Sequence, residues 1–127
     1  MKATDQRTRW FRQWHQTYGK PVMVTEYGGD TVAGLHSLPG LMFTEEWQVE
    51  MLKQYWEVFD TLRSSETWFI GEMPWVFSDF MTKQEIRRVV GNKKGLFTRD
   101  RQPKMAAHLL RDRYRNTMIQ RRKRDEL

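Results

Sequence analysis

A long amphipathic segment between two short apolar runs is the feature that most limits the fold of this chain. Residues 22–24 and 68–70 are the apolar runs, and continuous runs of this length are typical of strands buried on both faces. Between them, apolar side chains recur at helical spacing over residues 44–62, after a Thr that can cap a helix. A helical connection of this kind predicts a right-handed crossover between parallel strands. The sequence therefore predicts an α/β fold in which both strands end at the same edge.

Candidate functional side chains follow both predicted strands. Glu26 stands two residues after the first run, directly before a Tyr-Gly-Gly sequence, and Trp75 follows the second. The carboxyl edge of parallel strands is where α/β enzymes place their ligands. Glu26 is therefore a candidate catalytic acid. A solvated loop residue or a helix cap is the alternative that its position alone leaves open.

A basic loop bounded by glycines is the second candidate site. Residues 91–95 read Gly-Asn-Lys-Lys-Gly and include Asn92 and Lys94. Glycines let the backbone approach a ligand closely, and lysines supply charged donors, so the loop suits an anionic group. A solvated surface turn is the alternative.

Two further helices are predicted at the ends of the chain. Residues 5–18 carry an aromatic stripe that we expect to be buried, and a final helix starts with Pro103 in its first turn. The stripe consists of Trp10, Phe11, Trp14 and Tyr18, and the apolar face of the final helix consists of Ala106, Leu109, Leu110 and Tyr114. Both follow helical periodicity. Residues 119–127 are expected to form a basic, disordered tail after the last helix.

Composition excludes several classes of function. The chain has 127 residues, a net charge of +6 and no Cys, so disulfides, thiolate metal sites and a Cys nucleophile are excluded. Much of the charge lies at residues 121–124, and basic and aromatic residues are not interleaved as nucleic-acid binding requires. No run reaches membrane-spanning length. His15 has no partner His at metal-ligand spacing, and His36, in the long loop, could contact a ligand or be merely exposed. We expect no cofactor, metal, nucleic acid or membrane partner.

Four stretches carry a family resemblance that extends over about residues 8–118. They are residues 18–29, 41–46, 77–82 and 91–104, and they include Thr-Glu-Tyr-Gly-Gly and Gly-Asn-Lys-Lys-Gly. In these stretches the chain resembles the C-terminal part of the catalytic barrel of β-glucuronidases, which are retaining hydrolases of glycoside hydrolase family 2. The resemblance implies a partial TIM barrel, with the last two βα units and strands 7 and 8, over residues 1–118.

The resemblance also implies roles for particular residues and β-D-glucuronides as substrates. Glu26 matches the catalytic nucleophile of the family. Asn92 and Lys94 match the pair that binds the sugar carboxylate, Arg88 matches a basic residue near that carboxylate, and Trp75 matches an aromatic residue that lines the sugar site.

The chain departs from the family in two places. The family's general acid/base follows an Asn, and no Asn-Glu pair occurs in these 127 residues. The chain also reads Trp75-Val76-Phe77 where the family usually has Trp-Asn-Phe. We therefore expect the isolated chain to be inactive unless the remainder of the barrel is supplied. The alternative is a catalytically dead remnant, or a small α/β interaction module that self-associates through its open strand edges.

The two termini indicate different compartments. No signal peptide follows Met1, which favours the cytoplasm if Met1 is the native start. Residues 124–127 resemble an endoplasmic-reticulum retention signal, which favours the lumen of that compartment if the chain belongs to a longer parent.

Overall fold

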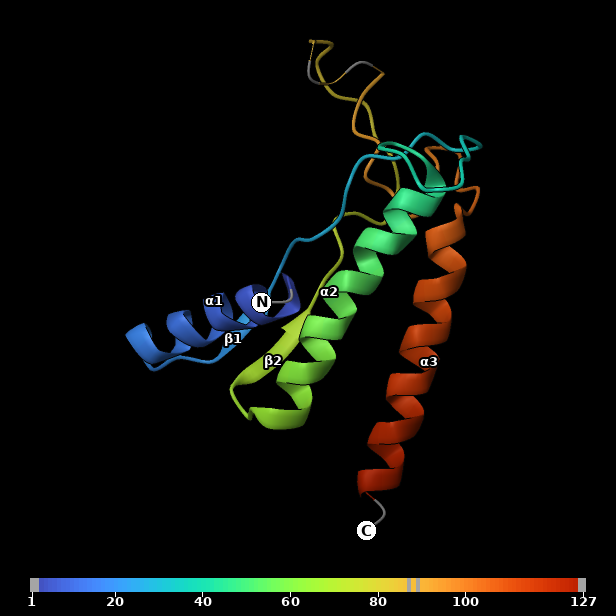
Figure 1. The fold of residues 1–127 in the computed structure, drawn as a ribbon. Helices are drawn as coiled ribbons and strands as arrows, with labels where there is room; N and C mark the ends of the chain where they lie inside the picture. The colour runs from blue at the N-terminus through green and yellow to red at the C-terminus, as the bar shows by residue number, and fades with distance from the viewer. Residues whose placement is uncertain (1–2, 87, 89, 126–127) are drawn as a thin grey trace.

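Three helices and a two-stranded sheet make up the fold (Figure 1). The computed structural model describes residues 3–86, 88 and 90–125. The elements in chain order are α1 (Ala3–Tyr18), β1 (Val22–Val24), α2 (Glu45–Ser65), β2 (Phe69–Glu72) and α3 (Met105–Asp125). The α/β class is confirmed, and the arrangement is consistent with a portion of an α/β barrel. None of the helices in the described part of the chain is both long and apolar enough to cross a membrane.

The two strands are parallel, as the helical crossover predicts. Their partners are Val22 and Phe69, Met23 and Gly71, and Val24 and Glu72, with one irregularity after the first pair. The pairing continues past the ends of the strands. The Met73 N–H donates to the Val24 carbonyl at 2.8 Å, and the Trp75 N–H donates to the Tyr27 carbonyl at 2.8 Å. The two segments that leave the sheet are therefore still held together at its carboxyl edge.

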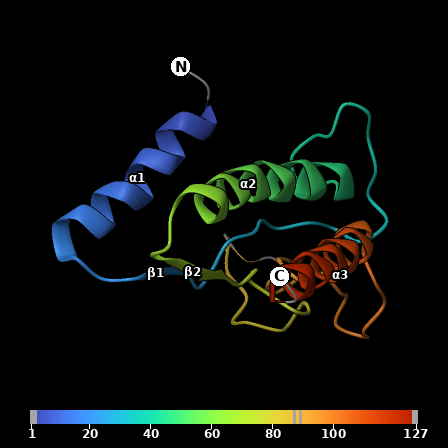
Figure 2. The ribbon, with the colours of Figure 1, turned by 90° about the horizontal axis from the view of Figure 1, so that it is seen from below.

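Helix α2 organises the packing of the other elements. It contacts α1, β2 and α3 and runs beside the sheet (Figure 2). Thr44 caps it, because its hydroxyl oxygen accepts the Trp47 N–H at 3.3 Å. Glu45, in the first turn of α2, accepts the Gly34 N–H at 2.7 Å and the Met105 N–H at 2.6 Å. One buried carboxylate thus joins α2, the loop after β1 and the start of α3.

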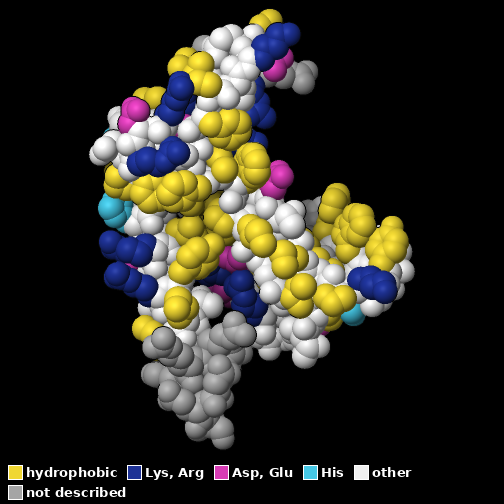
Figure 3. Space-filling view, turned by 180° about the vertical axis from the view of Figure 1, so that it is seen from behind, with side chains coloured by type: hydrophobic (Ala, Val, Ile, Leu, Met, Phe, Trp, Pro, Cys, Tyr) yellow, Lys and Arg dark blue, Asp and Glu magenta, His cyan; other side chains and the backbone are white. Residues whose placement is uncertain are grey.

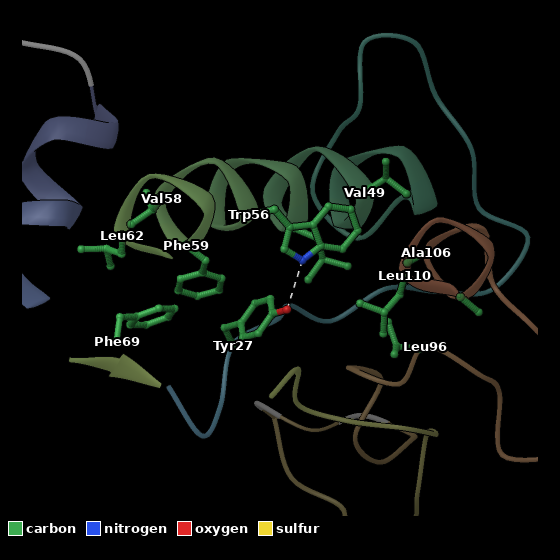
Figure 4. Packing of buried hydrophobic residues seen from close by; sticks show 12 residues of the cluster. Tyr27, Val49, Trp56, Val58, Phe59, Leu62, Phe69, Leu96, Ala106 and Leu110 are labelled. Carbon is green, nitrogen blue, oxygen red and sulfur yellow. Dashed lines mark hydrogen bonds between the residues drawn. The ribbon is translucent and has the colours of Figure 1, made fainter. Parts of the chain in front are cut away.

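Aromatic rings form the centre of the core between α2 and the sheet (Figure 4). Phe59 is fully buried, and its ring centroid lies 5.0 Å from that of Tyr27 and 5.5 Å from that of Phe69. The Tyr27 hydroxyl accepts a hydrogen bond from Trp56 Nε1 at 3.1 Å and donates one to Glu72 at 3.2 Å. The core therefore reaches the residue next to Glu26.

The expectation that the α1 aromatic stripe is buried is wrong for three of its four residues. Phe11 packs against the core, but Trp10, Trp14 and Tyr18 are 66%, 56% and 60% exposed. Helix α1 packs against α2 and β1, and its Phe11 ring lies 6.3 Å from that of Phe69 in β2. The face that carries the other three aromatic residues points away from these contacts. Hydrophobic side chains are accordingly visible on the α1 lobe, at the right of Figure 3.

The final helix also differs from expectation. Ala106 and Leu110 are buried, but Tyr114 is 41% exposed, and Pro103 precedes the helix, which begins at Met105. The helix continues to Asp125, so most of the segment expected to be a tail is helical, because Arg and Lys are good helix formers. The last two residues of the retention-like sequence, 126 and 127, lie outside the described residues.

Candidate active site

Glu26 lies at the carboxyl end of β1, where the sequence places it. Its side chain is exposed, and it lines a cleft of about 530 Å³ between β1 and α1. The walls of this cleft include Phe11, Trp14 and Tyr18 from the helix. Tyr27, the next residue, points into the core instead (Figure 4). The buried tyrosine thus anchors the backbone that presents Glu26.

Trp75 lies beside the segment that carries Glu26. Besides the 2.8 Å hydrogen bond from its amide to the Tyr27 carbonyl, its own carbonyl faces Gly28. Gly28 has a φ of 147°, and a Cβ atom there would lie 2.5 Å from the Trp75 carbonyl oxygen. Only glycine permits this approach. The Trp75 side chain is 36% exposed, and its ring meets the edge of Phe80 at a centroid distance of 6.3 Å.

The basic loop is ordered by hydrogen bonds within it and to the segment after β2. Asn92 is 1% exposed, and its Oδ1 accepts the Lys94 N–H at 2.9 Å. The Asn92 N–H donates to the Phe80 carbonyl at 2.9 Å, and the Lys94 carbonyl accepts the Val76 N–H at 3.3 Å. Residues 92–94 are therefore held in place by hydrogen bonds to the rest of the fold and do not form a solvated turn.

The same loop is bonded to the segment after β1. The Thr31 N–H donates to the Lys93 carbonyl at 2.9 Å, and Asp30 Oδ1 accepts the Lys93 N–H at 3.1 Å. The structure thus joins the segments that carry Glu26, Trp75, Asn92 and Lys94 at one edge of the fold.

Arg88 belongs to a different part of the fold. Its N–H donates to the Glu85 carbonyl at 2.9 Å, within a segment that projects beyond the ends of α2 and α3 at the top of Figure 1. Backbone hydrogen bonds connect Asn92 with Phe80 and Lys94 with Val76, whereas the bond of the Arg88 N–H stays within the projecting segment. Arg87 and Val89, on either side of Arg88, lie outside the described residues.

Two buried ionic residues at this edge have no role in the sequence-based interpretation. Lys104 and Asp79 form an ion pair of 2.9 Å beneath the basic loop, and Lys104 also donates to the Lys93 carbonyl at 3.0 Å. One sequence feature could have predicted this ion pair: Lys104 stands three residues before Ala107, in line with the apolar face of the last helix. A charged residue at such a position requires a buried partner.

The histidines make local contacts. His36 Nδ1 lies 2.7 Å from Glu46 Oε1, and the His15 ring stacks on Trp68 at 4.7 Å. Across residues 3–86, 88 and 90–125, no three acidic, His or Cys side chains form a group that could hold a metal ion.

Comparison with known proteins identifies the family of this chain. Residues 1–119 match the family described as glycosyl hydrolases family 2, TIM barrel domain. The β-glucuronidase of Chlorocebus aethiops is 53% identical over 109 residues, covering 86% of this chain and 16% of that protein. The β-glucuronidase of Paenibacillus borealis is 50% identical over 115 residues, covering 90% and 19%.

A solved structure supports the same relationship. The β-D-glucuronidase of Dictyoglomus thermophilum superposes with a TM-score of 0.81 at 52% identity, covering 87% of this chain and 18% of that one. The chain thus spans less than a fifth of the length of these relatives. It belongs to glycosyl hydrolase family 2, as a portion of the TIM barrel domain that is similar to β-glucuronidases.

Proposed function

We propose that this chain supplies the nucleophile and the carboxylate-binding loop of a retaining β-glucuronidase that hydrolyses β-D-glucuronides. Glu26 is the nucleophile, Asn92 and Lys94 bind the sugar carboxylate, and Trp75 lines the sugar site. Arg88 supplies a further positive charge near the carboxylate, from the projecting loop. Residues 1–118 form the barrel portion, and the chain requires no cofactor.

The observation that carries this proposal is the hydrogen bonding between the Glu26 segment and the basic loop. Asp30 and Thr31 bind the backbone of Lys93, so an exposed carboxylate and a cationic loop share one edge of the fold. A retaining glycosidase needs an ionised carboxylate to attack the anomeric carbon. A cationic loop can hold the substrate carboxylate by charge-assisted hydrogen bonds.

The general acid/base must come from outside this chain. A retaining mechanism requires a second, protonated carboxyl group about 5 Å from the nucleophile. Glu72 is bound by Arg63 at 2.8 Å and by Arg113 at 3.1 Å, and Asp79 is bound by Lys104. Both carboxylates therefore serve structural ion pairs, and we propose that the isolated chain is inactive.

The remainder of a barrel is the partner that fits the exposed side of β1. Two parallel strands leave unpaired backbone groups at both edges, and the cleft beside β1 is lined by Phe11, Trp14 and Tyr18. A further strand with its helix would cover both. We propose that this complement, supplied by a longer chain or by a separate fragment, also carries the missing acid/base.

Fragment complementation tests this proposal. The chain is mixed with a fragment that holds the N-terminal part of a family 2 barrel with its Asn-Glu pair, and hydrolysis of an aryl glucuronide is measured. We expect activity only in the mixture, and a loss on the order of 10⁴-fold with Glu26→Gln. Glu50→Gln, an exposed position on α2, is the matched control and should retain activity. Unchanged activity in the Glu26→Gln mixture would show that Glu26 is not the nucleophile.

A self-associating module is the second candidate function. The exposed aromatic side chains of α1 and the open edge of β1 favour it, because a second copy could cover them as well as a barrel fragment could. Activity in the complementation mixture would favour the barrel portion, whereas self-association without activity in any mixture would favour the module.

A further inference from the structure

We propose that Lys104 is a positioning residue that holds the carboxylate-binding loop against the segment that follows Glu26. This inference rests on the proposed function. Lys104 immediately precedes α3 and does not lie in either segment. Its role is to fix the distance between them, and it does not itself touch the substrate.

The Lys104 ammonium group has a complete set of buried acceptors. Its side chain is 0% exposed. It donates to the Thr31 carbonyl at 2.9 Å, to Asp79 Oδ1 at 2.9 Å and to the Lys93 carbonyl at 3.0 Å. A lysine ammonium has three hydrogens, so each acceptor receives one of them.

The three acceptors belong to three different segments of the active-site edge. Thr31 follows β1 and Glu26, Lys93 lies between the two candidate carboxylate-binding residues, and Asp79 belongs to the segment after β2. Asp79 Oδ1 also accepts the Gly95 N–H at 2.9 Å. One cation therefore connects the nucleophile segment with both ends of residues 93–95.

The electrostatics favour a fixed geometry. Burial lowers the pKa of Lys104, and the hydrogen bond and charge of Asp79 oppose that effect. A buried ammonium group that lost one acceptor would leave a charged donor unpaired, which costs more than an ordinary hydrogen bond contributes. The loop thus has one favourable arrangement over the cation. The Lys93 carbonyl is held inward in that arrangement, and the backbone positions of its neighbours Asn92 and Lys94 are fixed with it.

Gln48 provides a second, independent connection between the same segments. Its Nε2 donates to the Gly29 carbonyl and to the Gly95 carbonyl, at 3.3 Å each. Gln48 belongs to α2, and Lys104 immediately precedes α3. Two separate parts of the fold thus each contribute a donor group that joins the segment after Glu26 to the basic loop, and such support keeps the two parts of a site at a fixed distance.

The close approach of the chain at Gly95 shows why the loop depends on this support. A Cβ atom at Gly95 would lie 2.2 Å from the Asp79 nitrogen and 2.4 Å from the Phe97 carbonyl oxygen. The loop therefore has no side chain of its own at the point where it crosses the segment after β2. Its position there is set by Asp79, whose carboxylate is oriented by Lys104.

Hydrogen exchange of single amides tests the positioning role in the chain itself. Lys104→Met removes the charge and keeps the length of the side chain, and Lys53→Met, at an exposed position on α2, is the matched control. The reporters in the loop region are the amides of Thr31, Lys94 and Gly95, and the references in the sheet region are the amides of Met73 and Trp75. We expect about tenfold faster exchange or more for the reporters in Lys104→Met, with the references unchanged.

A ligand titration asks whether this positioning serves recognition of a carboxylate. Methyl β-D-glucuronide and the neutral methyl β-D-glucoside are titrated while the Asn92 and Lys94 amide signals are followed by NMR. We expect shifts that depend on the carboxylate in the original chain and in Lys53→Met, and an affinity for the glucuronide at least about tenfold weaker in Lys104→Met. The Met73 signal should stay in place in all three proteins.

Three outcomes would overturn the inference. They are unchanged reporter amides in Lys104→Met, equal acceleration of reporters and references, and unchanged glucuronide affinity. If Lys104→Met does not fold, Asp79→Asn replaces it, since that change keeps the shape of the side chain and removes its charge. Equal acceleration in Asp79→Asn would then be decisive against the inference. A lack of preference for the glucuronide in the original chain would instead contradict the proposed function, and the exchange ratios alone would then decide whether Lys104 holds the loop.

Discussion

Glu26 and Tyr27 are adjacent in the chain and have opposite surroundings. Glu26 is exposed at the cleft, whereas Tyr27 is 5% exposed and bonded to Trp56 and Glu72. Burial, with the nearby charge of Glu72, raises the pKa of Tyr27, so its hydroxyl stays protonated and donates to Glu72. Buried Tyr27 thus fixes the backbone position of Glu26. The sequence shows that an aromatic residue follows Glu26, but not that its side chain is buried.

The loop histidine gives a prediction about pH. The hydrogen bond that His36 donates to the Glu46 carboxylate raises the pKa of His36 above its ordinary 6.5. The pKa of Glu46 is lowered from 4.5 by hydrogen bonds that its carboxylate accepts from its own backbone, from His36 and from Ser37. Because the pKa of His36 is raised on folding, its contribution to stability is complete below pH 6.5 and is lost as the pH rises through the pKa of the folded state. Because the pKa of Glu46 is lowered, its contribution is complete above pH 4.5 and is lost as the pH falls through the pKa of the folded state. The pair therefore contributes most between about pH 4.5 and 6.5.

NMR titration of the His36 ring measures this effect. We expect a midpoint above 6.5 in the original chain and a return toward about 6.5 in Glu46→Gln. Glu50→Gln, one turn further along α2, should leave the midpoint where it was. An equal midpoint in all three proteins would show that the His36–Glu46 contact does not form in solution.

Some residues of the candidate site can be selected from the sequence alone, and others cannot. Glu26 and Trp75 follow strands, and Asn92 and Lys94 lie between glycines, so local patterns suffice to select them. Lys104 and Asp79 are far from each other in the chain, and their pairing depends on how the last helix docks. No local pattern carries that information, and this is why the sequence leaves them without a role.

Helix α2 is the element on which the other parts of the fold depend. It supplies eight buried residues and contacts α1, β2 and α3. Its start is fixed by Thr44, whose hydroxyl also donates to the Leu41 carbonyl at 2.7 Å. The loop before α2 and the helix itself thus share one capping side chain.

Removing the cap should destabilise the whole fold. Thr44→Ala leaves the Trp47 amide and the Leu41 carbonyl without the hydroxyl, and we expect the free energy of unfolding to fall by about 1 kcal/mol, the usual value for loss of an N-cap. Thr44→Ser keeps the hydroxyl and should lose less. Urea denaturation followed by circular dichroism measures both, and equal stabilities of the Ala variant and the original chain would contradict the capping role.

The helical and strand elements differ in how well the sequence predicts their surroundings. The crossover is correct because its signal is local: two apolar runs and one amphipathic helix. The surroundings of α1 are wrong because periodicity shows which face is apolar but not what covers it. The predicted end of the last helix is wrong because a basic sequence with few apolar residues can still be helical.

One surface of the molecule carries large apolar side chains of the kind usually found in a protein core. Trp14, Tyr18 and Met23 are exposed on α1 and β1, beside the cleft that contains Glu26. Exposed aromatic residues next to an open strand edge favour association. These exposed side chains are therefore available for contact with a second copy or with another polypeptide segment.

Sedimentation at several concentrations tests this property. We expect the average mass to rise above 15.5 kDa with concentration in the original chain, and to rise less in Trp14→Lys. Gln16→Lys, which adds the same charge at another exposed position of α1, should behave as the original chain does. A monomer with a cooperative thermal transition at all concentrations would argue against association and against the module as the second candidate function.

The carboxylate of Glu45 joins two helices that are far apart in the chain. It belongs to α2, yet it binds the first amide of α3, 60 positions later in the chain. The last helix therefore begins on a support that another helix provides. A change at Glu45 would therefore act on the start of α3 as well as on α2, and Lys104 lies directly before the amide that Glu45 binds. The place of Lys104, and with it the support of the basic loop, thus depends on a side chain of α2.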